Sequence, residues 1–421
     1  MDSFYIKGGN SLNGQVQISG SKNATLPIMA ASLMAADEVV LCGVPDLEDI
    51  NVMSDVLKLL GATVCREKDV LIINTRNMTG VELPESMSRR MRASNLVMGA
   101  LLARFKKAAV AYPGGCAIGS RPMDLHLKGF RALGYQIIDE CGVMVGEGHK
   151  PNGHETLLDF PSVGATENIM MAAALTPGIT TLRNAAREPE IIDLQNFLNR
   201  MGARIRGAGL DTIRIEGVER LHGVEHTVIP DRIEAGTFMV AAAITQGDVM
   251  IENIVLEHIQ SLIAKLREIG VEITSNGSWV RVSGHQPLRS ADIKTMPYPG
   301  FPTDMQPQMM ALLSMAAGTS IMVETIFENR FMHVHELRRM GADIKIEGRV
   351  AIIKGKDHLE GTAVEATDLR AGAALVLAGL CARGETRVGK LEHIDRGYAQ
   401  FHQKLQNLGA QIDRRAALES R

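Results

Sequence analysis

The feature that most constrains the fold of this chain is a helix ending that recurs six times along its 421 residues. Each copy ends in a large apolar residue followed by a glycine, and successive glycines lie 68 to 73 residues apart. Glycine is favoured just past a helix end because it adopts the left-handed backbone conformation without a Cβ clash. The recurrence predicts six copies of one structural unit, with helix ends at Gly61, Gly134, Gly202, Gly270, Gly341 and Gly409.

Each copy is predicted to contain two helices of different character and several strands. The helix before each glycine is amphipathic, as shown by the i, i+3, i+4, i+7 spacing of Ile259, Leu262, Ile263 and Leu266. Strand-like segments follow each glycine. The second helix is rich in Ala, Met, Leu and Gly and nearly free of charge, so we expect it to be buried. Its copies are residues 24–35, 93–103, 165–175, 233–245, 305–316 and 371–382.

Six such units predict an α/β fold of two domains, each with three βαβαββ-type repeats around a core. The sixth unit ends soon after residue 413, whereas the first has surplus strand-like segments at 4–7 and 15–18. We therefore expect residues 1–20 to complete the last unit, so that both termini lie in one domain. This gives one domain of residues 1–20 plus 230–421, and a second domain of residues 21–229.

Composition and charge argue against several classes of protein. The formal net charge of −3 gives no basis for nonspecific binding of nucleic acid or of an anionic membrane. The N-terminus lacks a secretory signal pattern, and the longest apolar stretches fall short of the roughly 20 residues that span a bilayer. The five cysteines show no C-x-x-C spacing, and the 12 histidines include no H-E-x-x-H. We therefore expect a soluble cytoplasmic protein without a metal site.

Charged side chains gather at the starts of the buried helices. Five of the six starts carry a charged residue, and four of these charges are positive. A helix N-terminus already carries partial positive charge, so a cation there is better explained by a bound anion. Each arginine alone could instead form a surface ion pair, but the recurrence favours a cationic cleft for a ligand with several negative charges. The candidates are Lys22, Arg92, Arg232 and Arg370, with Arg121, Arg330 and Arg396 near the amphipathic helices.

Two further residues could carry out chemistry. Cys116 lies in the glycine-rich stretch 113–119, five residues before Arg121, where backbone N–H groups and a guanidinium would stabilise a thiolate. The alternative is a small apolar residue in a tight turn. Asp304 stands where the other helix starts carry cations, so it could accept a proton from a substrate hydroxyl. The alternative for Asp304 is an N-cap, a position that Asp fills well.

Several ordered segments resemble one known family. They are residues 20–24 (GSKNA), 113–119 (PGGCAIG), 121–126 (RPMDLH), 184–190 (NAAREPE), 301–306 (FPTDMQ), 328–333 (ENRFMH) and 367–370 (TDLR). Spread over essentially the whole chain, they make it similar to the UDP-N-acetylglucosamine 1-carboxyvinyltransferase family of enolpyruvyl transferases. The resemblance implies a two-domain inside-out α/β barrel. It also implies transfer of the enolpyruvyl group of phosphoenolpyruvate to the 3′-hydroxyl of UDP-N-acetylglucosamine, with release of phosphate, through a tetrahedral intermediate. That reaction is the first committed step of peptidoglycan synthesis.

The resemblance also implies roles for individual residues. Cys116 would be the general acid and could add covalently to the enolpyruvyl carbon, and Asp304 would be the base for the sugar hydroxyl. Lys22, Arg121 and Arg396 would hold the phosphate of phosphoenolpyruvate, with Lys22 and Arg396 also counted as catalytic. Its remaining contacts would be Asn23, and Arg330 and Arg370 at the carboxylate region.

The resemblance implies a longer set of contacts to the sugar nucleotide. Phe160 stands where some family members have lysine, so its contact would come from the backbone or from packing, and Ile326 stands where some have valine. The implied contacts are Asn23, Arg92, Arg121, Pro122, Met123, Asp124, Leu125, Phe160, Pro161, Ser162, Val163, Asp304 and Ile326.

The family pattern implies neither a metal nor an organic cofactor. The Cys116 stretch would be a mobile lid that closes on the sugar nucleotide, and its cysteine implies alkylation by the epoxide fosfomycin. Two alternatives remain open. One is 5-enolpyruvylshikimate-3-phosphate synthase, which lacks the Pro-Gly-Gly-Cys stretch, and the other is an anion-binding paralogue without turnover.

Overall fold

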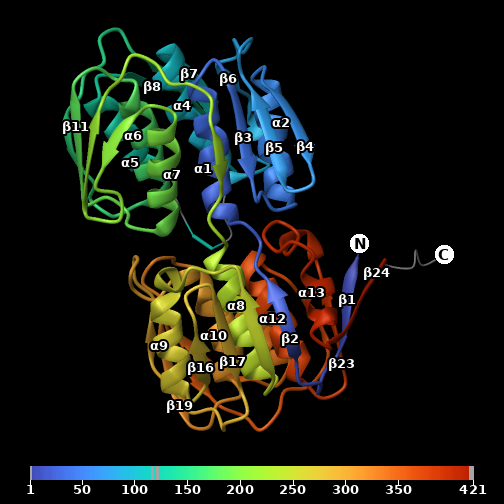
Figure 1. Cartoon of the computed structure of the whole chain (residues 1–421). Coiled ribbons are helices and arrows are strands. Elements are labelled where there is room, and N and C mark those ends of the chain that lie inside the picture. Colours follow the sequence, from blue (N-terminus) through green and yellow to red (C-terminus); the bar gives the residue numbers. More distant parts are fainter. Residues whose placement is uncertain (1, 115–117, 120–122, 417–421) are drawn as a thin grey trace. The chain divides into compact units, whose positions relative to one another are not determined.

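The computed structural model describes residues 2–114, 118–119 and 123–416 (Figure 1). Its internal contacts divide the chain into two compact units. Unit 1 comprises Met1–Ser19, Ala117–Ser120 and Pro230–Arg421, and unit 2 comprises Gly20–Cys116 and Arg121–Ile229. The chain therefore passes between the units after Ser19 and after Ile229, next to the boundaries predicted at residues 20 and 230. The grouping of residues 117–120 with unit 1 was not predicted.

Unit 2 contains three four-stranded sheets. In sheet order they are β14 (Glu225–Thr227), β3 (Glu38–Cys42), β5 (Val70–Asn74) and β4 (Thr63–Glu67); β6 (Glu82–Leu83), β7 (Lys107–Ala111), β9 (Val143–Glu147) and β8 (Gln136–Glu140); and β10 (Glu155–Leu157), β11 (Ile179–Arg183), β13 (Thr212–Glu216) and β12 (Arg204–Arg206).

Unit 1 also contains three four-stranded sheets. In sheet order they are β22 (Ala363–Glu365), β23 (Glu385–Gly389), β1 (Ser3–Lys7) and β24 (Gln411–Arg415); β16 (Glu272–Ser275), β17 (Trp279–Ser283), β15 (Asp248–Glu252) and β2 (Asn13–Gln17); and β18 (Ile293–Lys294), β19 (Thr319–Val323), β21 (Val350–Lys354) and β20 (Asp343–Glu347). In all six sheets one edge strand pairs in parallel and the other pairs are antiparallel.

The strands present one face to the core because their apolar residues alternate with polar ones. In β1 the side chains of Phe4 and Ile6 are buried, whereas Tyr5 is only half-buried and Lys7 is exposed. Successive side chains of a strand point to opposite faces of the sheet. One face of each sheet is therefore apolar and packs on the helices, and the other face is polar and exposed to solvent.

The helices of each unit fall into the two predicted classes. Three are buried over almost their whole length, which places the helices inside the sheets. They are α1 (Lys22–Ala31), α4 (Val97–Phe105) and α6 (Val163–Ala174) in unit 2, and α8 (Arg232–Ile244), α10 (Gln306–Leu313) and α12 (Leu369–Cys381) in unit 1. The half-exposed helices are α2 (Glu48–Leu59), α5 (Asp124–Ala132), α7 (Pro189–Arg200), α9 (Gln260–Ile269), α11 (His333–Arg339) and α13 (Phe401–Asn407). Short segments complete the list: α3 (Glu85–Ser88), η1 (Ser32–Met34), η2 (Arg92–Leu96), η3 (Leu256–Ile259), η4 (Thr303–Met305) and η5 (Leu391–His393).

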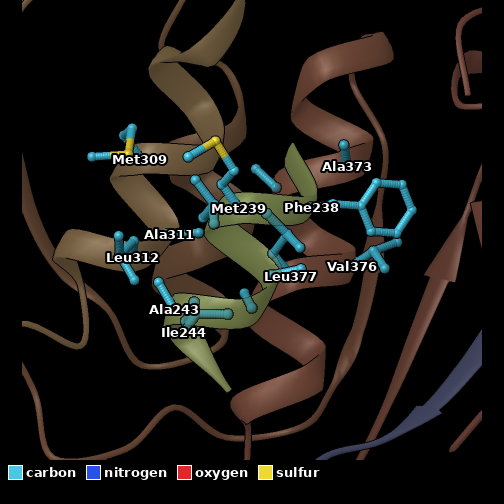
Figure 2. Close-up of a cluster of buried hydrophobic side chains, with 14 of the residues drawn as sticks. Phe238, Met239, Ala243, Ile244, Met309, Ala311, Leu312, Ala373, Val376 and Leu377 are labelled. Carbon is cyan, nitrogen blue, oxygen red and sulfur yellow. The ribbon is translucent and has the colours of Figure 1, made fainter. Parts of the chain in front are cut away.

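The core of unit 1 lies between its three buried helices (Figure 2). Phe238 and Met239 of α8, Met309 of α10 and Leu377 of α12 belong to this cluster, and all four are fully buried. A small residue also allows neighbouring segments to pack closely on α8: a Cβ on Gly236 would meet Leu262 of α9 and Met305 of η4. Dense packing of this kind holds the starts of α8, α10 and α12 in fixed positions.

The predicted α/β fold of six repeats, three in each unit, is confirmed. All six repeat glycines have positive φ, from 85° to 105°, as a left-handed residue past a helix end requires.

The assignment of residues 1–20 to the last repeat was only partly right. β1 does join β23 and β24 of the sixth repeat, but β2 pairs in parallel with β15 of the fourth repeat. Likewise β14, which precedes α8, pairs with β3 of the first repeat. In the other four repeats the strand before a buried helix pairs with the strand after it. At the two crossings the strand stays in the unit that the chain is leaving, while the helix begins in the other.

Candidate active site

Asp304 of unit 1 forms ion pairs with two buried arginines. Its Oδ1 accepts from Arg330 Nη2 at 3.0 Å, and its Oδ2 accepts from Arg370 Nη2 at 3.1 Å and Arg370 Nε at 3.3 Å. The arginine side chains are only 2% and 3% exposed, whereas the Asp304 side chain is 27% exposed. Burial by itself would lower the pKa of Arg370, but the negative charge of Asp304 raises it above its usual range. The Asp304 carboxylate is therefore partly accessible, while the two arginines that bind it are buried.

Each of these three side chains comes from a different repeat position. Asp304 lies in η4, directly before α10, and Arg370 is the second residue of α12. Arg330 lies between β19 and α11. The capping position of α10 is Met305, without a side-chain capping bond. The carboxylate of Asp304 is thus engaged by guanidinium groups, while α12 is capped by Asp368, which accepts from the N–H groups of Arg370 and Ala371.

Aromatic rings support both arginines. The guanidinium carbon of Arg370 lies 5.4 Å from the centre of the Tyr398 ring, and that of Arg330 lies 5.7 Å from the Phe327 ring. These are cation–π distances. Arg330 Nε and Arg370 Nη1 are buried and have no hydrogen-bond partner among the described residues. Buried donors in this state favour an anionic ligand beside the Asp304 pair.

The Tyr398 hydroxyl belongs to a closed polar network in the core of unit 1. It lies 3.0 Å from Thr237 Oγ1 of α8 and accepts from Gln308 Nε2 of α10 at 3.1 Å. Gln308 Nε2 also donates to Thr237 Oγ1 at 3.2 Å. All three residues are buried. The network therefore ties two buried helices to the ring on which Arg370 of the third helix rests.

The remaining predicted residues of unit 1 lie on loops. Arg396 is half-buried after η5, and Ile326 is half-buried between β19 and α11. Ile326 and Phe327 donate their backbone N–H groups to Glu324 Oε1 at 2.8 and 3.1 Å. Glu324 is 1% exposed, and sequence reasoning did not single it out.

Lys22 is the first residue of α1 in unit 2 and forms a buried ion pair. Its Nζ lies 3.2 Å from Asp49 Oδ2 in the first turn of α2, and both side chains are nearly inaccessible. Ser21 caps the helix by accepting from the N–H of Ala24. Asn23, the next predicted contact, is half-buried. The cation at this helix start is therefore anchored by an acidic side chain that the sequence pattern did not reveal.

The predicted sugar-nucleotide contacts of unit 2 lie at the starts of helices. Arg92 begins η2, Asp124 begins α5, and Ser162 caps α6 by accepting from the N–H of Ala165 at 3.4 Å. Phe160 is 45% exposed, and its carbonyl accepts from the N–H of Ser162 at 2.7 Å. Helix starts present N–H groups and partial positive charge, which suits the phosphates of a nucleotide. The other predicted members here are Met123, Leu125, Pro161 and Val163, of which Met123 is buried and the rest half-buried.

His126 lies beside these helix starts and is held neutral. Its Nδ1 lies 2.9 Å from Asn168 Nδ2, and Asn168 Oδ1 accepts from the N–H of Gly99. Because the amide nitrogen must donate, Nδ1 accepts and the ring proton is on Nε2. Burial, and then the charge of Arg92, lowers the pKa of His126 to about 3.

Cys116, Arg121 and Pro122 lie outside the described residues, so their predicted roles stay predictions. Of the same stretch, Ile118 and Gly119 are described. The carbonyl of Ile118 accepts from the N–H of Asn329 at 2.9 Å. A Cβ on Gly119 would collide with the carboxylate of Glu328. Ile118 and Gly119 therefore contact the same loop that carries Ile326 and Arg330.

No group of three or more His, Cys, Asp or Glu side chains in residues 2–114, 118–119 and 123–416 is arranged to hold a metal ion. In the same part of the chain, no helix combines the length and apolar character needed to cross a bilayer.

The chain is similar to known proteins along nearly its whole length. The family model of EPSP synthase (3-phosphoshikimate 1-carboxyvinyltransferase) matches residues 6–405. A UDP-N-acetylglucosamine 1-carboxyvinyltransferase 1 of Caldanaerobacter subterraneus subsp. tengcongensis is 58% identical over 412 residues, 98% of this chain and 99% of the relative. Two relatives in Carboxydothermus hydrogenoformans, named UDP-N-acetylglucosamine 1-carboxyvinyltransferase 1 and 2, are 54% and 56% identical over 98% of this chain and 98% and 99% of their own lengths.

Solved structures share the fold. The enolpyruvyl transferase NikO from Streptomyces tendae matches with a TM-score of 0.89 at 26% identity, over 99% of both chains. An EPSP synthase from Acinetobacter baumannii matches with a TM-score of 0.77 at 20% identity, over 99% of this chain and all of the other.

Proposed function

Because this chain belongs to the enolpyruvyl transferase family that includes EPSP synthases and UDP-N-acetylglucosamine 1-carboxyvinyltransferases, we propose how its residues perform the transfer. The chain is a transferase. Its reaction moves the enolpyruvyl group of phosphoenolpyruvate to the 3′-hydroxyl of UDP-N-acetylglucosamine, releases phosphate, and serves peptidoglycan synthesis. The observation that carries this assignment is 54–58% identity to carboxyvinyltransferases of that name over nearly the full chain.

The addition step needs a base and an acid. Asp304 accepts the proton of the 3′-hydroxyl as its oxygen attacks carbon 2 of phosphoenolpyruvate, and Cys116 donates a proton to carbon 3. The result is a tetrahedral intermediate that still carries the phosphate. In the elimination step the phosphate leaves carbon 2, carbon 3 gives back a proton, and the double bond forms again. Arg330 and Arg370 support this role because they orient both carboxylate oxygens of Asp304 and favour the ionised form.

The cations bind the two charged ends of phosphoenolpyruvate. Lys22, Arg121 and Arg396 hold its phosphate, and Arg330 and Arg370 hold its carboxylate region. The unpartnered buried donors of Arg330 and Arg370 support this division, since each keeps one nitrogen available beside Asp304. Asn23 contacts both substrates.

The sugar nucleotide is bound chiefly by helix starts and by one loop. The start of α5 contributes residues 123–125, the start of α6 contributes residues 160–163, η2 contributes Arg92, and the loop after β19 contributes Ile326. Arg121 and Pro122 complete the proposed contacts. At Phe160 the contact comes from the backbone, since the phenyl ring replaces the lysine of some relatives and offers no charge.

The Cys116 stretch acts as a lid, and fosfomycin alkylates the thiol. We place the enzyme in the cytoplasm, where its nucleotide substrate is made available, and through cell-wall synthesis we connect it with cell shape and division.

The test is release of phosphate from phosphoenolpyruvate by the purified protein with each of two acceptors. UDP-N-acetylglucosamine should support release and shikimate 3-phosphate should not. Release with shikimate 3-phosphate alone would identify an EPSP synthase. Release with neither acceptor would favour an anion-binding paralogue and contradict the proposed reaction.

A further inference from the structure

Glu324 is a buried carboxylate that accepts four hydrogen bonds. Its Oε1 accepts from Thr295 Oγ1 at 3.0 Å and from the N–H groups of Ile326 and Phe327 at 2.8 and 3.1 Å. Its Oε2 accepts from Thr303 Oγ1 at 3.0 Å. Burying a carboxylate is costly unless hydrogen bonds replace its water. The four donors meet that requirement without any cation among the partners described.

The donors of Glu324 come from the two segments that carry the candidate chemistry. Thr303 directly precedes Asp304 in η4. Ile326 and Phe327 open the loop that leads to Arg330, and the Phe327 ring lies against the Arg330 guanidinium. Arg330 in turn donates to Asp304, so the two segments are also connected by this hydrogen bond. One carboxylate thus joins the start of α10 to the loop after β19.

Thr295 links the same carboxylate to β18. The Thr295 hydroxyl accepts from the N–H of Thr325 at 2.9 Å, and its carbonyl accepts from the Thr325 hydroxyl at 2.6 Å. Its N–H donates to the carbonyl of Val323. Val323 and Thr325, the residues on either side of Glu324, are therefore both hydrogen-bonded to Thr295. We expect a substitution of Glu324 to change the position of residues 326–330 and to leave the sheet in place.

The other repeats show that the fold does not need a glutamate here. The residue after the corresponding strand is left-handed in four repeats: Gly43, Asn184, Asn253 and Lys390 have φ of 72°, 54°, 58° and 58°. Asn184 and Asn253 there donate to a carbonyl of the neighbouring parallel segment. Glu324 occupies this position in the fifth repeat without positive φ and with a different set of partners. A departure from the repeat next to the candidate site points to function.

We propose that Glu324 is a positioning residue: it fixes the position of the Asp304 carboxylate relative to the sugar-contacting loop at 326–330. The proposal rests on the roles given above to Asp304 and Ile326. Glu324 touches neither substrate in it. Its Thr303 arm orients the base, which affects turnover, and its N–H arm orients the loop, which affects binding of the sugar nucleotide.

The two arms can be separated by substitution. Thr303→Val removes only the hydroxyl that reaches Glu324, and Thr303→Ser restores it. We expect Thr303→Val to lower kcat by about tenfold with little change in KM for UDP-N-acetylglucosamine, because small misplacements of a catalytic group are costly. Thr303→Ser should recover most of the loss. Glu324→Gln keeps the size of the side chain but removes its charge, so it should raise that KM and lower kcat.

A double variant distinguishes action through Glu324 from a direct effect of Thr303. Residues that act as one unit give non-additive losses. Thr303→Val combined with Glu324→Gln should therefore lose little more turnover than the worse single variant, and an additive loss would overturn the proposal. Glu336→Gln is the control, because Glu336 is also buried in unit 1 and accepts from the N–H of Glu365 and from Arg339, and none of the described contacts of its carboxylate is to Asp304, Arg330 or Arg370.

Calorimetric binding of UDP-N-acetylglucosamine separates failure of this proposal from failure of the proposed function. Glu324→Gln should weaken binding several-fold while Glu336→Gln does not. If the wild-type protein binds the nucleotide without turning it over, the proposed reaction is wrong. The nucleotide affinity of Glu324→Gln relative to the wild type then still tests the positioning role of Glu324. If Glu324→Gln matches the wild type in binding and in kcat, the positioning role is wrong.

Discussion

Arg370 donates two hydrogen bonds to the same oxygen of Asp304, from Nε at 3.3 Å and from Nη2 at 3.1 Å. The second oxygen is held by Arg330, so both arginines limit the rotation of the carboxylate. The two buried cations stabilise the negative charge of this carboxylate. Proton transfer to Asp304 is therefore favourable only as the new carbon–oxygen bond forms, when the acidity of the hydroxyl rises. This arrangement suits a base that acts in the transition state and not before it.

Replacing Asp304 with asparagine tests this role. The amide keeps the shape but cannot take a proton, so kcat should fall by about 100-fold or more, as expected for loss of a general base. Stability should fall by less than the about 3–5 kcal/mol of a fully buried ion pair, because the Asp304 side chain is 27% exposed. Steady-state kinetics and urea unfolding measure the two effects. Exposed Asp357→Asn is the control, and full turnover by Asp304→Asn would exclude the base role.

Local sequence patterns foretold most of the fold. The six glycines with positive φ and the uncharged helices between them are short-range signals, and each depends on its own backbone conformation or burial. The pairing of β2 with β15 and of β14 with β3 was not foreseeable in this way. A strand's partner is decided by where the chain crosses between units, and nothing in Gln15 to Ile18 encodes that choice.

The candidate site was foreseen through its cations, and its supporting residues were missed. Asp49 and Tyr398 are distant in sequence from Lys22 and Arg370, and Glu324 is distant from Thr295 and Thr303. A single buried carboxylate or tyrosine has no periodic signal. One clue was available for Glu324, since it breaks the pattern of left-handed residues seen after the equivalent strands of four repeats. Tyr112 of the second repeat also lacks positive φ at this position, so the pattern marks Glu324 together with Tyr112.

Fosfomycin should label one cysteine. Cys116→Ala removes the proposed nucleophile, so labelling should disappear and turnover should fall severely. Intact-mass measurement after incubation with the epoxide gives the stoichiometry, and peptide mapping gives the site. Cys65 and Cys141 are exposed and provide a strict comparison. Cys65→Ala should label like the wild type, and full labelling of the Cys116→Ala protein would show that another thiol reacts.

Acid should destabilise the protein partly through His126. Its pKa is about 3 in the folded chain, below the 6.5 of an unperturbed histidine, because burial disfavours the charged ring. The unfolded state therefore binds the proton first, and the stability is fully present above about pH 6.5 and is lost progressively toward pH 3. Between pH 7 and pH 5 the loss from this residue should be about 2 kcal/mol.

Urea unfolding at the two pH values measures this contribution. His126→Gln should lose less stability between pH 7 and pH 5 than the wild type, although it is less stable at pH 7 because the bond to Asn168 changes. His149→Gln alters an exposed histidine and should leave the pH dependence unchanged. Equal pH dependence in His126→Gln and the wild type would mean that the ring takes up its proton at the same pH in the folded and unfolded protein.

Tyr398 links the core of unit 1 to Arg370 by two separable interactions. Tyr398→Phe removes the hydroxyl that meets Thr237 and Gln308 but keeps the ring against the guanidinium, so stability should fall by about 1–3 kcal/mol. Turnover should fall only modestly, since Arg370 loses its interaction with the hydroxyl but keeps its contact with the ring. Tyr398→Leu also removes the ring, and Arg370 then loses the cation–π contact at 5.4 Å. KM for phosphoenolpyruvate should therefore rise more in the leucine variant than in the phenylalanine variant. Tyr5→Phe, at a ring that contacts Arg415 in a different part of unit 1, is the control for the loss of a hydroxyl. Equal KM values in the two Tyr398 variants would show that the ring does not orient Arg370.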